Sequence, residues 1–120
     1  MPHVLVVEDE PDVAAAALAV LRLEGFDAQL AVDGQKALNA MRKDRPGAVL
    51  LDLVLPVMDG WQLLEAMSAD PDLRLIPVVV TSALPEPNAP GARMVLTKPY
   101  ALDRLVAALS RFVKPVSPPA

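Results

Sequence analysis

The chain has 120 residues and a net charge of −4, and 53% of its residues are hydrophobic although only 3% are aromatic. This length fits a single domain, and the hydrophobic content excludes a disordered chain. The chain has no cysteine, no cluster of lysine and arginine, and no apolar run long enough to span a membrane, so we expect a cytoplasmic domain without disulfides or direct nucleic-acid contact.

Short apolar runs alternate with segments of helical periodicity along the chain. The apolar runs predict strands at residues 3–7, 27–32, 47–51, 76–80 and 94–97. Helices are expected at about 11–23, behind Pro11, and behind the turn signals Asp33-Gly34 and Asp59-Gly60. A last helix is indicated by apolar residues at 3–4 residue spacing, namely Leu102, Leu105, Val106, Leu109 and Val113. The inner faces of the second and third helices should carry Ala37, Leu38, Met41, Leu63, Leu64 and Met67.

Strands that alternate with helices predict an α/β domain, a doubly wound parallel sheet covered on both faces. A helix between the fourth and fifth strands is the weak element, because prolines stand at positions 85, 87 and 90 and proline is poorly tolerated inside helices. We expect this helix to be shortened or replaced by a Pro-rich loop. The domain should cover residues 1–113, and the proline-containing residues 114–120 read as a tail or linker.

The first helix is apolar on more than one side. A helical wheel places an inner face against the sheet at Val13, Ala16, Ala17, Val20 and Leu21. The opposite face would then carry Ala14, Ala15, Leu18, Ala19 and Arg22. Such a face is either ordinary exposed alanine or a docking patch anchored by Leu18.

Polar residues come directly after four of the predicted strands. In a doubly wound sheet, ligands bind beyond the carboxyl ends of the strands. These positions hold Glu8 and Asp9, Asp52, Thr81 with Ser82, and Lys98. Clustered carboxylates repel one another unless a cation lies among them, and Mg²⁺ prefers oxygen ligands. Because a carboxylate can form an aspartyl phosphate and Asp52 ends an apolar strand without a neighbouring acid, Asp52 is the candidate nucleophile.

Each of these residues also has a plain structural interpretation. Asp9 or Glu10 could cap the first helix, and Thr81 and Ser82 could cap the segment after the fourth strand. Lys98 could be an ordinary surface lysine, whereas Asp59-Gly60 fits turn chemistry better than catalysis. A structural role alone is less convincing for Asp52, because unpaired acids are rarely buried.

In this arrangement the chain resembles the response regulator receiver domains of two-component signalling over residues 1 to about 113. The matching motifs are Val-Glu-Asp-Glu at 7–10, Leu-Asp at 51–52 continuing through Leu-Pro-Val-Met-Asp-Gly at 55–60, Val-Thr-Ser-Ala at 80–83 and Thr-Lys-Pro-Tyr at 97–100. The resemblance implies a flavodoxin-like strand order of 2-1-3-4-5 and a domain that catalyses only its own phosphorylation and dephosphorylation.

The resemblance also implies a role for each site residue. Asp52 would be the phosphoacceptor, Thr81 would hydrogen-bond the phosphoryl group and Lys98 would pair with it. Mg²⁺ would be bound by Asp9, Asp52 and the backbone carbonyl of Val54, with Glu8 acting through water. The phosphoryl donor would be a phosphohistidine on a sensor histidine kinase or a histidine phosphotransfer protein.

Two departures from the family pattern leave alternatives open. The family's usual aromatic switch position holds Val95, and the helix before it is missing or short. Both changes would suit a pseudo-receiver, a binding module that phosphorylation does not switch, although the complete set of acids, hydroxyl and lysine argues against it. An aspartyl-phosphate phosphatase is a distant third, because Val54 stands where that class carries a second aspartate.

Overall fold

Five parallel strands form one sheet in the computed structural model, which describes residues 2–85 and 87–116. The strand order is β2-β1-β3-β4-β5, which confirms the doubly wound, flavodoxin-like sheet. The strands are β1 (Val4–Val7), β2 (Ala28–Ala31), β3 (Ala48–Asp52), β4 (Val78–Ser82) and β5 (Met94–Thr97). The helices are α1 (Pro11–Leu23), α2 (Gly34–Lys43), α3 (Gly60–Ser68) and α4 (Leu102–Ser110).

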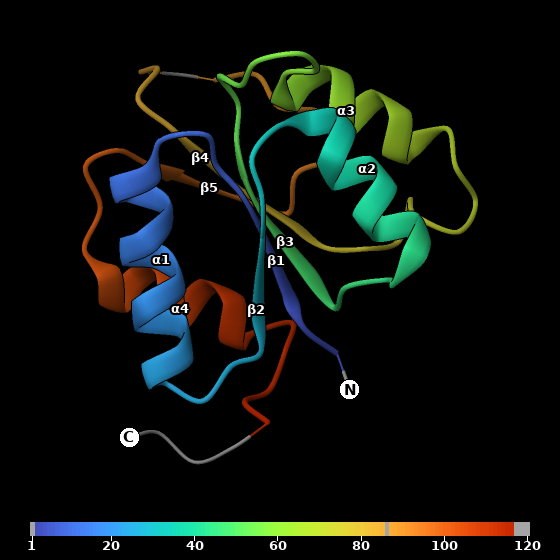
Figure 1. Ribbon diagram of the computed structural model, residues 1–120. Helices are drawn as coiled ribbons and strands as arrows, with labels where there is room; N and C mark the ends of the chain where they lie inside the picture. The colour runs from blue at the N-terminus through green and yellow to red at the C-terminus, as the bar shows by residue number, and fades with distance from the viewer. Residues whose placement is uncertain (1, 86, 117–120) are drawn as a thin grey trace.

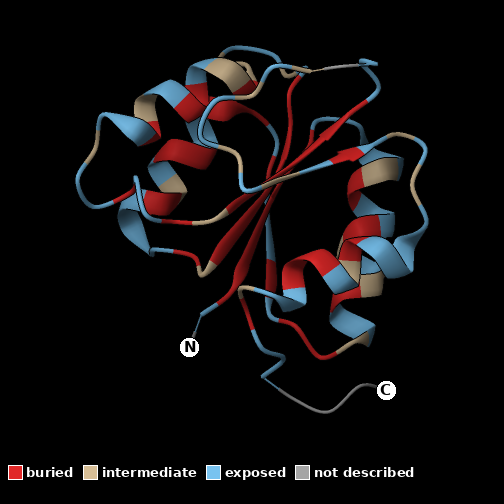
Figure 2. Cartoon of the chain, turned by 180° about the vertical axis from the view of Figure 1, so that it is seen from behind, coloured by how far each residue is buried: buried red, intermediate tan, exposed pale blue. Residues whose placement is uncertain are grey.

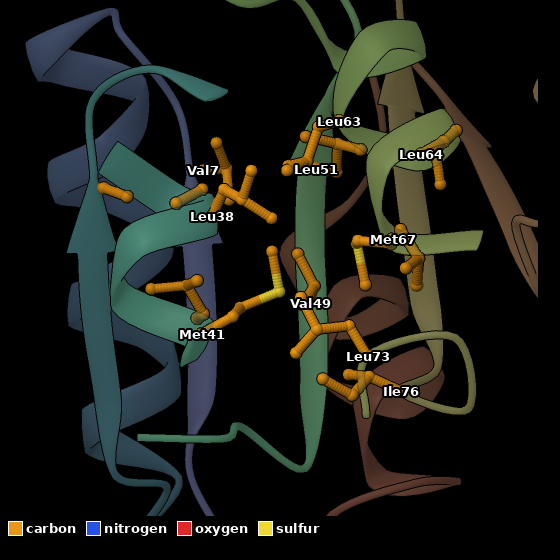
Figure 3. Packing of buried hydrophobic residues seen from close by; sticks show 14 of the residues in the cluster. Val7, Leu38, Met41, Val49, Leu51, Leu63, Leu64, Met67, Leu73 and Ile76 are labelled. Carbon is orange, nitrogen blue, oxygen red and sulfur yellow. The ribbon is translucent and has the colours of Figure 1, made fainter. Parts of the chain in front are cut away.

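Helices cover both faces of the sheet (Figure 1). One hydrophobic cluster lies under α2 and α3, and the other lies under α1 and α4. The central strands β1, β3 and β4 are buried along their whole length, as Figure 2 shows in red. Side chains from successive positions of β3 point to opposite faces, so Val49 and Leu51 enter the cluster under α2 and α3 (Figure 3), whereas Leu50 enters the other.

The inner face of α1 differs from the predicted one. Its buried residues are Ala14, Ala17 and Leu21, and Leu18 packs against the same cluster, at the spacing i, i+3, i+4, i+7 of a core-facing stripe. Ala16 is exposed. The prediction was right for Ala17, Leu21 and Val20, which are buried or pack against this cluster, and wrong for the other positions. The helix is apolar nearly all round, so periodicity alone did not fix its rotation. Leu18 is therefore a packing residue and not an outward anchor.

The segment between β4 and β5 contains no helix in its described residues, as the prolines predicted. Ala89 and Ala92 pack against the cluster under α2 and α3, so the segment covers part of the surface that a helix would have covered. The Trp61 indole N–H donates a hydrogen bond to the Asn88 carbonyl over 2.7 Å, which holds the segment to α3. No spacing pattern in the sequence indicated this bond.

Other differences concern the ends of elements. The fourth strand begins at Val78, and Ile76 lies in the turn before it, although the Ile76 side chain is buried in the core. The last helix ends at Ser110, and Leu102 is exposed because it lies in the first turn, outside the buried stripe of Leu105, Ala108 and Leu109. The predicted tail at 114–120 is described only as far as 116, where the Val116 N–H bonds the Gly25 carbonyl over 2.9 Å.

Candidate functional site

The candidate site lies where the parallel strands end. Asp52 is the last residue of β3 and is paired in register with Thr81 of β4. The backbone N–H of Lys98 donates to the Ser82 carbonyl over 2.7 Å, which fixes the start of the loop after β5 beside the end of β4. The sheet therefore brings residues that are far apart in the sequence to one edge, as expected for parallel strands.

Three carboxylates and one ammonium group gather at this edge. Lys98 Nζ lies 3.4 Å from Glu8 Oε1 and 3.5 Å from Asp52 Oδ2. Glu8 and Asp52 are nearly buried, with exposed fractions of 4% and 9%, whereas Asp9 is exposed. Lys98 is thus not an ordinary surface lysine, because its charge is the one cation that compensates two buried acids within the described residues.

Lys98 neutralises only part of the negative charge that the carboxylates of this cluster carry. Burial raises the pKa of Glu8, and the nearby Asp52 carboxylate adds to this effect, against the opposing influence of the Glu10 N–H and Lys98. Burial acts to lower the pKa of Lys98, but the carboxylates of Asp52 and Glu8 outweigh it and leave that pKa raised. A further positive charge would therefore be stabilised here.

The donor set fits a divalent cation that binds oxygen. Glu8, Asp9 and Asp52 can each present a carboxylate oxygen such that all three oxygens lie within 4.8 Å of one another. Two of these groups are buried, and Lys98 offsets only part of their charge. Hard cations such as Mg²⁺ take this kind of ligand, usually one or two carboxylates together with water and substrate oxygens.

The capping interpretations are not supported for the acids before α1. The N-cap of α1 is Glu10, and its side chain makes no capping hydrogen bond. The Glu8 carboxylate instead accepts the Glu10 N–H over 3.2 Å, which aims Glu8 toward Lys98. Ser82 does have a local structural bond, because its Oγ accepts the Leu84 N–H over 3.0 Å.

The loop from β3 to α3 is held by hydrogen bonds of its backbone to side chains and to the start of α2. Its first turn is tied to Asp52, whose Oδ1 accepts the Val54 N–H over 3.4 Å. Farther along, the Gly34 N–H at the start of α2 donates to the Met58 carbonyl over 3.0 Å. Asp59 then forms a capping box with Gln62 at the start of α3, so the Asp59-Gly60 pair serves the turn, as predicted. Val57 has φ +66°, an unfavourable conformation for a β-branched residue.

An open apolar groove of about 550 Å³ adjoins Lys98, and sequence reasoning did not find it. Its walls come from α1, the end of β4 and the loop before α4, and they include Val13, Ala16, Ala83, Pro99, Tyr100 and Leu102. Burial raises the pKa of the Tyr100 hydroxyl. The groove is lined on the α1 side by Val13 and Ala16, the residues that the wheel had placed against the sheet.

Comparison with known proteins agrees with this geometry. The family model for the response regulator receiver domain matches residues 4–110. The transcriptional regulatory protein PrrA of Mycobacterium tuberculosis is 39% identical over 94% of this chain and 50% of its own length, and the DNA-binding response regulator MtrA of Mycolicibacterium smegmatis is 38% identical over 88% and 47%. The chain thus spans about half the length of these relatives.

Solved structures show the same likeness over the whole domain. The signal receiver domain of a histidine kinase from Syntrophus aciditrophicus superposes with a TM-score of 0.87 at 28% identity, covering 98% of this chain and 93% of that one. The receiver domain of a sensor histidine kinase from Pseudomonas aeruginosa, crystallised with a magnesium ion in its active site cleft, gives 0.85 at 30% identity, covering 92% and 96%. Within the described residues no helix is long and apolar enough to cross a membrane.

Proposed function

Because the chain belongs to the response regulator receiver domain family, we propose that it accepts a phosphoryl group from a phosphohistidine donor onto the Asp52 carboxylate. The observation that carries the proposal is the convergence of Asp52 with two further carboxylates and Lys98 at the carboxyl edge of the sheet. A module that only binds other proteins does not need this arrangement of charges, so it argues against the pseudo-receiver alternative.

The chemistry assigns a distinct task to each side chain. One Asp52 oxygen forms the new bond to phosphorus while the bond from phosphorus to the donor imidazole nitrogen breaks. Lys98, already 3.5 Å from Asp52, pairs with the phosphoryl oxygens, and Thr81, the in-register neighbour of Asp52, donates its hydroxyl to one of them. The domain catalyses this reaction on itself alone, so it is a substrate of its partner and not an enzyme toward other molecules.

Asp9, Asp52 and the Val54 carbonyl would hold Mg²⁺, with Glu8 acting through water. When bound, the ion neutralises charge on the phosphoryl oxygens during transfer. The support from the structure is the spacing of the three carboxylates and their incomplete neutralisation by Lys98.

The phosphohistidine donor belongs to a sensor histidine kinase or a histidine phosphotransfer protein. The apolar groove beside Lys98 offers such a partner a surface within reach of Asp52. A cytoplasmic location is proposed on the basis of family membership. MtrA is a DNA-binding response regulator, but the part of it that this chain matches is about half its length. For residues 1–120 themselves we still expect no direct contact with nucleic acid.

The test is intact mass after incubation with acetyl phosphate, with and without Mg²⁺. The wild type should gain one phosphoryl group only when Mg²⁺ is present, and Asp52→Asn should gain none. Asp27→Asn removes an exposed aspartate just before β2, away from the site, and should label like the wild type. If Asp52→Asn were labelled at the wild-type rate, the assignment would be wrong.

A further inference from the structure

We infer that the edge strand β2 is a pairing site for β2 of a second copy of this chain, and that Arg22 holds this site closed. β2 forms one edge of the sheet and pairs only with β1. Figure 1 shows it between the layer of α1 and α4 and the layer of α2 and α3. The inference does not depend on phosphorylation of Asp52.

The register of β2 on β1 fixes which of its backbone groups face outward. The Glu8 N–H donates to the Ala31 carbonyl over 3.1 Å, so Ala31 faces β1. Successive residues of a strand direct their N–H and C=O groups to opposite sides, and Gln29 therefore faces β1 as well. Ala28 and Leu30 direct theirs away from the sheet, where a further strand could pair with them.

One of these outward groups already has a partner. Arg22 lies in the last turn of α1, and its Nη2 donates a hydrogen bond to the Ala28 carbonyl over 2.8 Å. The guanidinium group therefore lies where a neighbouring strand would have to place its own N–H. A charge in this position also discourages pairing, because an incoming strand would remove it from water.

β2 carries no such protection in its own sequence. Edge strands of natural proteins are commonly protected by charged residues, by proline or by a bulge. Residues 28–32 include no charged residue and no proline, and Leu30 and Val32 are 41% and 39% exposed. The opposite edge strand, β5, follows Arg93 and precedes Lys98 and Pro99. The protection of β2 therefore comes from α1, through the Arg22 contact.

A second copy of β2 is a suitable partner for this edge. With a two-fold axis at Gln29, antiparallel pairing places Ala28 of one copy opposite Leu30 of the other, and each such pair exchanges both N–H···O bonds. Asp27 would lie opposite Ala31, so the pairing brings no like charges directly together. It would also cover part of the exposed Leu30 side chain.

The helices leave room for this arrangement. α1 contacts both β1 and β2. Because neighbouring strands lie about 4.8 Å apart, the α1 helices of two paired copies would lie roughly 10 Å apart, which is an ordinary distance between packed helices. Arg22 is then the group that has to leave the edge before pairing.

The test is analytical sedimentation of the full chain over a range of concentrations, without a phosphodonor. Arg22→Ala should dimerise with a Kd about tenfold or more below that of the wild type, because the Arg22 bond of each copy no longer has to break. In the dimer of this variant the Leu30 amide should become protected from hydrogen exchange. In the wild type the same amide faces solvent and should exchange rapidly.

Three controls make the result specific. Arg74→Ala removes an exposed arginine before β4 and should sediment like the wild type. Adding Leu30→Lys to Arg22→Ala places a charge on the edge strand and should restore the monomer. Adding Asp52→Asn to Arg22→Ala should leave dimerisation unchanged, which separates this inference from the phosphorylation proposal.

Several outcomes would overturn the inference. A folded Arg22→Ala protein that stays monomeric at every concentration would do so, whether or not some other strand can bind the edge. A dimer that persists with Leu30→Lys, or that protects amides of β5 and α4 in place of Leu30, would assign pairing to another surface. Equal protection of Leu30 in the wild type would show that Arg22 does not close the edge. If Arg22→Ala fails to fold, Arg22→Lys replaces it, and a dimer Kd equal to that of the wild type would then contradict the inference.

Discussion

Gly34 is the residue where a single added methyl group should disturb both the fold and the site. A Cβ at this position would lie 2.1 Å from the Met58 carbonyl oxygen and 2.9 Å from its carbon, so backbone would have to move. Crowding of this kind typically costs about 1–3 kcal/mol. The hydrogen bond from Gly34 to Met58 would be lost as well, at about 0.5–1.5 kcal/mol.

One effect opposes these costs, because alanine is favoured over glycine inside helices by up to about 1 kcal/mol. The sum predicts that Gly34→Ala destabilises the protein by about 2 kcal/mol. For a domain of this size that corresponds to a fall in Tm of roughly 8 °C. Urea unfolding and thermal melting measure both quantities.

The site should also respond, because Met58 lies in the loop that carries the Val54 carbonyl. Mg²⁺ affinity, followed by titration in the absence of a phosphodonor, should fall in the variant. Gln35→Ala changes the adjacent exposed position of α2 and should alter the Tm little. A Gly34→Ala protein that melts at or above the wild-type Tm and binds Mg²⁺ equally well would refute the reasoning.

Two further predictions concern the loops that border Asp52. Val57 has φ +66°, which a β-branched residue adopts at a cost of about 1–2 kcal/mol. Val57→Gly should therefore raise the free energy of unfolding by about 0.5–1 kcal/mol after the entropy cost of glycine, and a decrease in urea unfolding would contradict this. Val54 lies two residues after Asp52, and Ala83 lies two residues after Thr81. Both side chains are exposed and apolar, so neither can orient a hydrolytic water. Val54→Asn with Ala83→Glu should shorten the lifetime of the phosphorylated protein about tenfold or more, measured by intact mass over time; unchanged decay would count against it.

The arrangement of Asp52 and Lys98 was predictable because it is a consequence of topology. The carboxyl ends of parallel strands lie at one edge of the sheet, so the residues just after each apolar run were expected to meet at that edge. The residue types at these positions then showed which functional groups the site contains, namely carboxylates, hydroxyls and one amine. That a helix before β5 would be shortened or replaced by a loop was also predictable, because proline lacks the backbone N–H that a helix interior requires.

The rotation of α1 could not be predicted, because alanine on several faces gives periodicity no preferred direction. The sequence also could not predict the contact between Gly34 and Met58 or the hydrogen bond from Trp61 to Asn88. Each joins loops or helix ends whose positions depend on how the helices pack on the sheet, and neither leaves a spacing pattern in the sequence.

The Trp61 bond has a consequence for how the native state opens. In the described part of the connection from β4 to β5, the backbone amides of Ala92 and Arg93 donate hydrogen bonds to backbone carbonyls. The connection is attached to α3 and the core by the hydrogen bond from the Trp61 indole and by the packing of Ala89 and Ala92. Releasing so few contacts costs less than global unfolding. The connection should therefore be the first cooperative unit to exchange its amide protons under native conditions, and the first place where a protease cuts the otherwise intact domain.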